Sequence, residues 1–256
     1  MKRLGTMDEL IQWPRATFWD KPWNPWIGCV PISPACYHCY AKTATEDRFG
    51  QSFSPHKTRK LAPPQSGVVF VGNMTDIFGG WISPSEIWDY LSKLSYFDPT
   101  GGGRKPFDAT YLFCTKRVAN MADVLGIYQE VPNAYFGFTA ENQEWFDKRS
   151  DDAMKIPERH KLWLSAEPLL GPVDISGPMC DRLKWVAVGC ESGPRRRPCK
   201  IEWIEDIVDQ CVALDIPVFV KQLDIGGVCQ RDITKFPERL QIRQVPWHKK
   251  GEDNGH

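Results

Sequence analysis

The sequence predicts an α/β fold built on parallel strands, and two observations lead to it. Short runs of consecutive apolar residues, the pattern of strands buried on both faces, recur along the chain. Between these runs lie longer segments whose apolar residues repeat at helical spacing. In a chain of 256 residues this predicts a full or partial (β/α) barrel of about six to seven parallel strands. The alternative is an open doubly wound parallel sheet, which has the same alternation.

The N-terminal part is expected to begin with a helix and a strand. Residues 7–13 can form a short helix, which Pro14 would end. The β-prone residues 16–19 predict a first strand, which leads into a cysteine-rich loop. Residues 40–49 have helical character, so this part should read strand, loop, helix.

Six further apolar runs predict the remaining strands. The helix after the first of these runs opens with Ser83 and Pro84, a favourable start, and places Ile87 and Leu91 on one face. Strands are expected at residues 68–71, 111–114, 134–138, 162–164, 185–188 and 218–220. Helices are expected at residues 83–94, 118–125, 142–153 and 201–214. One domain is expected over residues 1–224, and residues 225–256 are expected to form a C-terminal extension with a frayed tail.

Composition limits the location and the partners of the chain. Lys+Arg and Asp+Glu are both 32, so net charge gives no global attraction to nucleic acid. No run of about 18 apolar residues and no apolar N-terminus is present, so we expect a cytoplasmic protein without a membrane partner. Nine cysteines in a reducing compartment are expected to be metal ligands or buried thiols.

Three of these cysteines, Cys29, Cys36 and Cys39, lie within eleven residues. Short cysteine spacings occur in both iron–sulfur and zinc sites. A structural zinc site needs four protein ligands, whereas a four-iron cluster held by three cysteines leaves one iron open. A zinc-stabilised nucleic-acid-binding module without catalysis is therefore the alternative function. Its fourth ligand would be His38, His56 or Asp47.

The spacing Cys-x6-Cys-x2-Cys resembles the Cys-x3-Cys-x2-Cys motif of radical S-adenosylmethionine (SAM) enzymes, with His38 in the place of the aromatic residue before the last cysteine. Residues 18–41 are also similar to a phage and prophage protein family that shares the three-cysteine motif and is regarded as radical-SAM-like. The similarity continues at residues 73–78, 115–117, 141–143, 165–172, 191–193 and 221–222.

The resemblance implies an enzyme of incomplete-barrel fold. Cys29, Cys36 and Cys39 would hold a [4Fe–4S] cluster whose open iron binds SAM. An electron donor would reduce the cluster, and SAM would be cleaved to a 5′-deoxyadenosyl radical. The phage association implies a nucleic-acid base, such as a modified thymine, or a nucleotide as substrate, and thus DNA modification in a bacterial host.

Polar residues follow most of the predicted strands, at the end where ligands bind in α/β folds. Single residues of this kind also serve as turns and helix caps, which is the alternative for each of them. The candidates for SAM contacts are His38, Asn73, Asp76, Lys116, Thr139, Glu141, Ser165, Glu167, Glu191 and Lys221.

A basic segment follows the sixth predicted strand. Prolines flank its three consecutive arginines, so it is a loop. It is either a contact for nucleic acid or another anion at the mouth of the fold or an ordinary exposed loop. The basic residues are Arg195, Arg196, Arg197 and Lys200.

Overall fold

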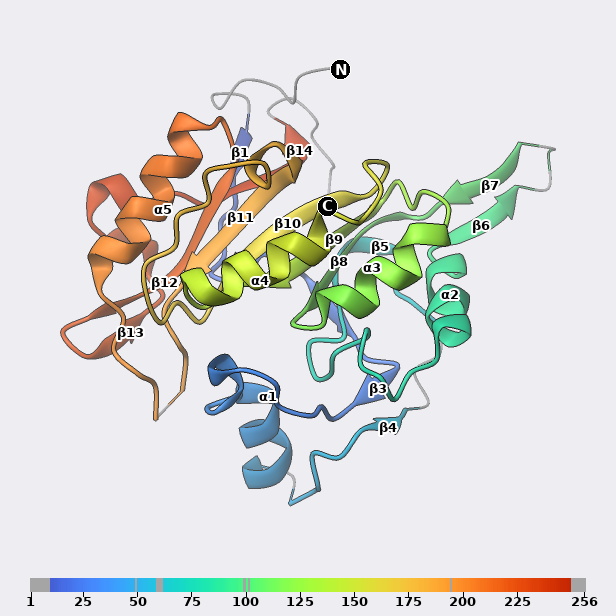
Figure 1. Ribbon diagram of the computed structural model, residues 1–256, viewed down its shortest axis with the longest axis horizontal. Coiled ribbons are helices and arrows are strands. Elements are labelled where there is room, and N and C mark those ends of the chain that lie inside the picture. Colours follow the sequence, from blue (N-terminus) through green and yellow to red (C-terminus); the bar gives the residue numbers. More distant parts are fainter. Residues whose placement is uncertain are drawn as a thin grey trace. The chain divides into compact units, whose positions relative to one another are not determined.

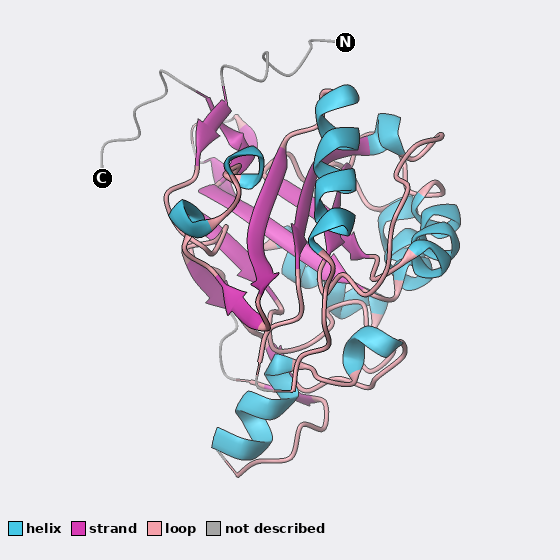
Figure 2. Cartoon of the chain, turned by 90° about the vertical axis from the view of Figure 1, so that its left-hand side faces the viewer, coloured by secondary structure: helices cyan, strands magenta, loops and turns pink. Residues whose placement is uncertain are grey.

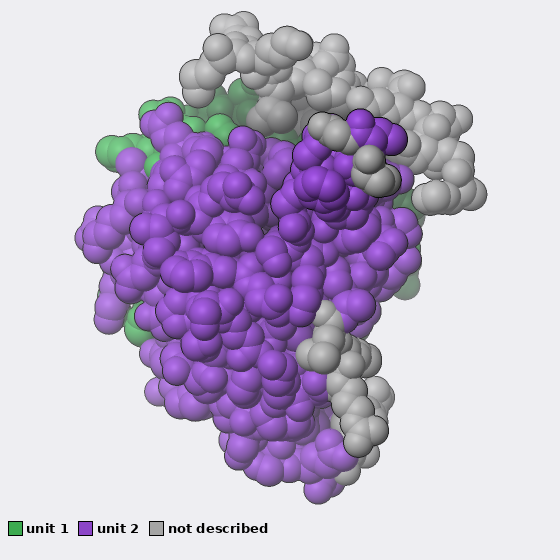
Figure 3. All heavy atoms as spheres, turned by 90° about the vertical axis from the view of Figure 1, so that its right-hand side faces the viewer, with its two compact units in different colours: residues 1–18, 140–146, 162–256 green, residues 19–139, 147–161 purple. Residues whose placement is uncertain are grey.

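The computed structural model describes residues 10–48, 50–58, 62–98, 100, 102–193 and 195–249. They form two compact units, coloured separately in Figure 3. Unit 1 comprises the described residues within 1–18, 140–146 and 162–256, and unit 2 those within 19–139 and 147–161. Some residues with a predicted structure lie outside the described residues. They are residues 7–9 of the first predicted helix, residue 49 of the next, residue 194 beside the arginine-rich loop and residues 250–256 of the C-terminal extension.

Unit 2 is built on four parallel strands joined by helices (Figure 1). The strands, in their order across the sheet, are β2 (Lys21–Trp23), β5 (Ser66–Val71), β8 (Asp108–Thr115) and β9 (Ala134–Thr139). Helix α2 (Pro84–Ser92) lies between β5 and β8 in the chain, and α3 (Val118–Ile127) lies between β8 and β9. The Ser83 hydroxyl accepts a hydrogen bond from the Glu86 N–H at 3.3 Å, which caps α2 as its sequence predicts.

Shorter elements complete unit 2. A hairpin of β3 (Trp26–Ile27) and β4 (His56–Lys57) brackets the cysteine-rich loop. That loop contains the turn η2 (Pro34–Cys36) and leads into α1 (Tyr40–Thr43) and the π-helical turn η3 (Ala44–Arg48). Strands β6 (Ser95–Asp98) and β7 (Gly103–Pro106) form a second hairpin. Helix α4 (Gln143–Ala153) carries residues of both units.

Unit 1 contains a second run of parallel strands (Figure 2, magenta). These are β10 (Lys161–Ala166), β11 (Leu183–Gly189) and β12 (Val218–Ile225). All of β10 except Lys161 belongs to unit 1. Helix α5 (Ile201–Ala213) joins β11 to β12, and β13 (Val228–Gln230) is antiparallel to β12. Short 3₁₀ turns are η4 (Cys180–Arg182), η5 (Ile233–Lys235) and η6 (Glu238–Leu240). Strand β1 (Leu10–Gln12) pairs antiparallel with β14 (Gln244–Lys249).

An aromatic cluster fills the core of unit 1. The ring of Phe18 meets that of Trp185 edge to face, with centroids 4.9 Å apart, and Trp163 packs on Trp185 at the same distance. The Trp185 indole N–H donates to the Gln244 carbonyl at 2.9 Å, so the buried polar atom of this ring is paired. Burial of such large side chains is the main favourable term that holds the strands of the unit together.

The predicted α/β class and the six later strands are confirmed, as are the helices from residue 83 onward. The two runs contain eight strands rather than about seven, since β13 adds an antiparallel strand that no apolar run predicted. No helix within the described ranges has the length and apolarity to cross a membrane.

Two predictions near the N-terminus are wrong. Residues 10–12 form the strand β1 rather than part of a helix, because their backbone pairs with β14, a partner far away in the sequence. The first parallel strand lies at residues 21–23 rather than 16–19. Asp20 explains the shift: its N–H donates to the Val68 carbonyl and its carboxylate accepts from the Val68 N–H, both at 2.8 Å, so pairing with β5 begins there.

Candidate functional site

The three cysteines of the loop lie in unit 2, are free thiols and are partly exposed. The Cys29 thiol donates to the Val30 carbonyl at 3.6 Å, and the Cys36 sulfur lies 3.9 Å from the Ser33 hydroxyl. Within the described ranges, no three or more His, Cys, Asp and Glu side chains are gathered closely enough to hold a metal ion. The loop therefore supplies suitable donors that are not drawn together here.

The first end of the loop is fixed by close backbone contact. Gly28 has a φ of +93°, and a Cβ there would lie 2.3 Å from the Ser54 carbonyl oxygen, so only glycine fits. Its N–H donates to the Met74 carbonyl at 3.0 Å, and its own carbonyl accepts from the Thr75 hydroxyl at 2.6 Å. The segment that follows β5 thus holds the residue before Cys29.

The predicted SAM residue Asn73 fixes the other end of the loop. Its carbonyl accepts a hydrogen bond at 2.6 Å from the hydroxyl of Tyr40, the residue that follows Cys39. Its side-chain oxygen accepts from the Asn24 amide at 2.7 Å, and Asn24 also accepts from the Met74 N–H at 3.1 Å. In this structure, the Asn73 side chain acts as part of the support of the loop.

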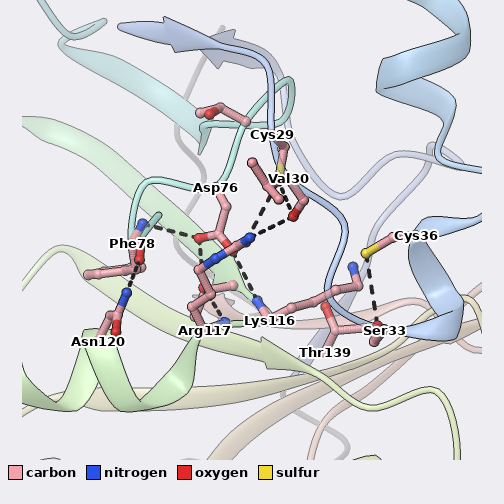
Figure 4. A network of polar contacts seen from close by, with 12 residues as sticks. Cys29, Val30, Ser33, Cys36, Asp76, Phe78, Lys116, Arg117, Asn120 and Thr139 are labelled. Atoms are coloured by element: carbon pink, nitrogen blue, oxygen red, sulfur yellow. Dashed lines mark hydrogen bonds and ion pairs between the residues drawn. The ribbon is translucent and has the colours of Figure 1, made fainter. Parts of the chain in front are cut away.

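Asp76, a second predicted SAM contact, is a buried hub of four hydrogen bonds (Figure 4). One carboxylate oxygen accepts from the Phe78 N–H at 3.1 Å and the Thr115 hydroxyl at 2.7 Å. The other accepts from the Lys116 N–H at 3.3 Å and the Arg117 guanidinium at 3.0 Å. A carboxylate has about four acceptor positions, so Asp76 is saturated by its neighbours.

The Arg117 guanidinium lies between Asp76 and the cysteine loop (Figure 4). Its Nη1 is 3.7 Å from the Cys29 sulfur, and its Nη2 donates to the Val30 carbonyl at 2.6 Å. Burial and the charge of Asp76 raise the pKa of the Cys29 thiol to about 11, against the opposite effect of Arg117. Without a bound cation, Cys29 is therefore a thiol at neutral pH.

The remaining candidates in unit 2 have separate surroundings. Lys116 meets Asp76 through its backbone N–H. Thr139 is buried at the end of β9, with its hydroxyl 3.5 Å from the Cys114 sulfur. His38 is partly exposed beside the exposed Tyr37. The structure brings Cys29, Asp76 and Lys116 into one network.

In unit 1, two predicted residues pair with each other. The Lys221 ammonium donates to both oxygens of Glu167, at 2.6 and 2.9 Å. The Gln222 amide donates to Glu167 at 2.7 Å and to the Cys190 carbonyl at 2.7 Å. Both charged side chains are partly buried, so this group is a compact ion pair supported by one amide.

Glu191 and Arg197 form a second ion pair in unit 1. The Arg197 backbone N–H and Nε donate to one Glu191 oxygen at 2.8 and 3.0 Å, and Nη2 donates to the other. Arg197, expected to contact an anionic ligand, is therefore engaged within the protein. Arg195 is exposed, Arg196 is partly exposed, and the Lys200 ammonium lies 5.6 Å from the centre of the Trp203 ring.

The last two candidates in unit 1 are buried. Glu141 is completely buried, and its carbonyl accepts from the Leu170 N–H at 2.7 Å. The Ser165 carbonyl accepts from the Ala140 N–H at 3.0 Å. A buried carboxylate such as Glu141 needs compensating partners, which distinguishes it from an ordinary exposed residue in a helix first turn.

Sequence reasoning did not single out the contact between Arg117 and Cys29, nor the role of Asn24. The ion pair between Asp76 and Arg117 could have been found from the strand order, because the two residues follow the neighbouring parallel strands β5 and β8. Asn24 precedes the cysteine loop in an Asn-Pro-Trp segment, and a polar residue at the end of a strand is a weak signal. Of the alternative zinc ligands, His56 has Nδ1 2.9 Å from the Ser54 carbonyl and Asp47 is exposed.

Comparison with known protein families identifies a match over most of the chain. The model of the family DUF5131, described as "Protein of unknown function", matches residues 11–246. No curated protein and no solved structure matches the chain significantly. The match begins within β1 and ends within β14, so it includes the cysteine loop and every strand-end residue discussed above.

Proposed function

We propose that this chain, which belongs to the family DUF5131, is an iron–sulfur enzyme of the radical SAM type. One observation supports this most: three free thiols, Cys29, Cys36 and Cys39, lie on one loop whose two ends are held by the segment after β5. The donors fit a [4Fe–4S] cluster in kind and in number, with one iron left for another ligand. For a cluster to bind, the loop would have to bring its three sulfur atoms together.

When bound, such a cluster supplies one electron to SAM and so starts radical chemistry. The part of the chain is to hold the cluster and orient SAM. We propose that the parallel strands form a partial (β/α) barrel with SAM at their carboxyl ends. Candidate contacts are His38, Asn73, Asp76, Lys116 and Thr139 of unit 2 and Glu141, Ser165, Glu167, Glu191 and Lys221 of unit 1.

Metal analysis tests the cluster. After anaerobic reconstitution, the wild type should bind iron and sulfide, show a brown absorption band and lose both in a triple Cys→Ala variant of Cys29, Cys36 and Cys39. One zinc and no iron would reject the enzyme and favour a zinc-stabilised nucleic-acid-binding module. A triple variant of the buried Cys190, Cys199 and Cys211 controls for thiols in general, provided that its circular dichroism matches the wild type.

The SAM site has its own test at Glu141. Replacement by Gln removes the charge and keeps the size of this completely buried side chain. If Glu141 contacts SAM, calorimetry should show affinity weakened by about 1–3 kcal/mol, the value of a charged hydrogen bond. Unchanged affinity in a folded Glu141→Gln protein would assign this carboxylate to structure alone.

We propose a nucleic-acid base or nucleotide as the substrate, with an electron donor as the second partner in a reducing, cytoplasmic compartment of a phage-infected host. Nine free cysteines are compatible with such a compartment. Arg195, Arg196 and Lys200 are further basic side chains of the loop that follows β11, and they can meet phosphates. Because Arg197 is held by Glu191, it is the least available of the four.

Product analysis tests the substrate. Reduced protein and SAM are incubated anaerobically with phage DNA, free nucleosides or transfer RNA, and nucleosides and 5′-deoxyadenosine are measured by mass spectrometry. A nucleoside of altered mass, formed together with extra 5′-deoxyadenosine, would identify the substrate class. An unchanged 5′-deoxyadenosine yield with every nucleic acid would reject it, whatever metal the loop binds.

A further inference from the structure

Arg117 is held in one position by groups of unit 2 on two sides. Strands β5 and β8 are parallel neighbours with Val71 opposite Phe113, so the segments that follow them emerge side by side. Asp76 follows β5, Arg117 follows β8, and their side chains form an ion pair at 3.0 Å. The guanidinium also lies over the Trp81 ring, 4.8 Å from its centre.

The position of this guanidinium is strongly determined. The Arg117 and Asp76 side chains are 12% and 7% exposed. Asp76 cannot easily rotate away, because three donors besides Arg117 hold its oxygens. Few alternative conformations remain for the guanidinium, so its charge is fixed in space rather than averaged over many rotamers.

Arg117 also faces a predicted metal ligand. Nη1 is 3.7 Å from the Cys29 sulfur, and Nη2 holds the next residue through the Val30 carbonyl at 2.6 Å (Figure 4). A planar guanidinium can make both contacts at once, whereas the single ammonium of a lysine cannot make them in the same geometry. Arg117 thus combines a charge near the sulfur with an anchor for the loop.

A fixed charge at this place affects a cluster in a predictable direction. Reduction adds one negative charge, which a nearby cation stabilises and a nearby anion destabilises. Arg remains protonated at any physiological pH, so its effect is constant. Asp76 lies on the far side of Arg117 and should act with the opposite sign.

We propose that Arg117 is a positioning residue that anchors the Cys29 segment and raises the reduction potential of the cluster, while Asp76 orients Arg117 and partly offsets its charge. This inference rests on the proposed function, because it requires a cluster on Cys29. It moves Asp76 from the candidate SAM contacts to the support of the metal centre, and it adds Arg117 there. The anchoring contact itself exists without any cluster.

The test compares midpoint potentials of variants of nearly unchanged size. Arg117→Gln removes the positive charge, and Asp76→Asn removes the negative charge. Each is reconstituted anaerobically, analysed for iron and sulfide, and titrated with electron paramagnetic resonance as the readout. The control Lys105→Gln removes one positive charge from β7, where Lys105 is paired with Asp98 in a separate hairpin.

Opposite shifts are expected. The potential should become more negative in Arg117→Gln and more positive in Asp76→Asn, and it should not change in Lys105→Gln. A purely structural role would not produce two shifts of opposite sign. Equal potentials in all variants, or shifts of the same sign in both, would overturn the inference.

Loss of the proposed function gives a different result. If the wild type binds no iron, the cluster is rejected, and the potential is not measured. The anchor is then tested alone by hydrogen exchange in the metal-free protein: the amides of Cys29 and Val30 should exchange faster in Arg117→Gln than in Lys105→Gln. If Arg117→Gln does not fold, Arg117→Lys replaces it. Lysine keeps the positive charge, so the reduction potential should stay close to the wild-type value. The same amides should still exchange faster than in Lys105→Gln, because the anchor is lost. Unchanged exchange in a folded variant would reject the anchor.

Discussion

Arg197 donates three hydrogen bonds to the carboxylate of Glu191, six residues earlier in the chain. One of these bonds comes from the backbone and two come from the guanidinium. The Glu191 side chain is only 4% exposed, so its charge depends on this partner. The pair closes the loop after β11 and reduces the basic surface that this loop presents.

Replacing Arg197 by Ala should therefore reduce stability. Loss of one partner of a fully buried pair costs about 3–5 kcal/mol, and because Arg197 is partly exposed we expect about 2–3 kcal/mol. Urea unfolding measures the change. The control Arg195→Ala removes a neighbouring exposed arginine and should change stability by no more than about 0.5 kcal/mol. Equal losses in both variants would contradict a structural role specific to Arg197.

Gly28→Ala should disturb the cysteine loop. The added Cβ would meet the Ser54 carbonyl oxygen at 2.3 Å, and the φ of +93° is unfavourable for alanine. We expect a loss of more than about 2 kcal/mol in urea unfolding, since left-handed backbone alone costs alanine about 1–2 kcal/mol. Gly50→Ala is the control, because Gly50 also has positive φ, +61°, but nothing lies within 4 Å of its added Cβ. Similar losses in the two variants would show that the contact with Ser54 is unimportant.

The ion pair of Glu167 and Lys221 should show energetic coupling. Lys221→Met leaves a partly buried carboxylate with the Gln222 amide alone, and we expect a loss of about 1–3 kcal/mol. In Glu167→Gln, the same lysine replacement should cost clearly less. A double-mutant cycle by urea unfolding measures the difference. Lys235→Met, at an exposed pair, should show little effect, and additive losses for Glu167 and Lys221 would refute the coupling.

His160 should make stability depend on pH. It is buried with Nε2 3.1 Å from the Leu125 carbonyl, and burial lowers its pKa, although this hydrogen bond opposes the effect. The unfolded chain then binds a proton more readily than the folded one, so stability is fully present above a pH of about 6.5 and decreases below it until the folded form also protonates.

Urea unfolding between pH 7.5 and 5.5 measures this dependence. The loss on acidification should be smaller in His160→Asn than in the wild type. Gln51→Asn, a replacement at an exposed position without a titratable group, should keep the wild-type dependence. A wild-type slope in His160→Asn would assign the dependence to other groups.

The parallel strands could be predicted because burial on both faces demands consecutive apolar residues, as in Val68–Val71 and Trp185–Val188. Strand β1 could not, because its conformation is set by pairing with β14, which lies far away in the sequence. Strand β13 is short and partly exposed, so it has no apolar signal. Long-range pairing of this kind is not encoded in local periodicity.

The candidate site was predictable to a similar extent. The three cysteines and the polar strand ends can be read directly from the sequence, since neighbouring parallel strands end at the same edge. What the sequence does not give is which polar residues satisfy each other. Asp76 with Arg117, Glu167 with Lys221, and Glu191 with Arg197 are pairs that depend on strand order and loop conformation.

The pairing of β1 with β14 has a consequence for synthesis on the ribosome. Leu10 lies opposite Lys249, so β1 is synthesised long before its partner strand β14. At a synthesis rate of roughly 5–20 residues per second, about 240 residues take on the order of 12–48 s. During that time the backbone hydrogen-bonding groups of β1 lack the sheet partner that they have in the folded protein. A nascent chain stalled before residue 244 should therefore expose this segment to proteases and chaperones, and emergence of residues 244–249 should protect it.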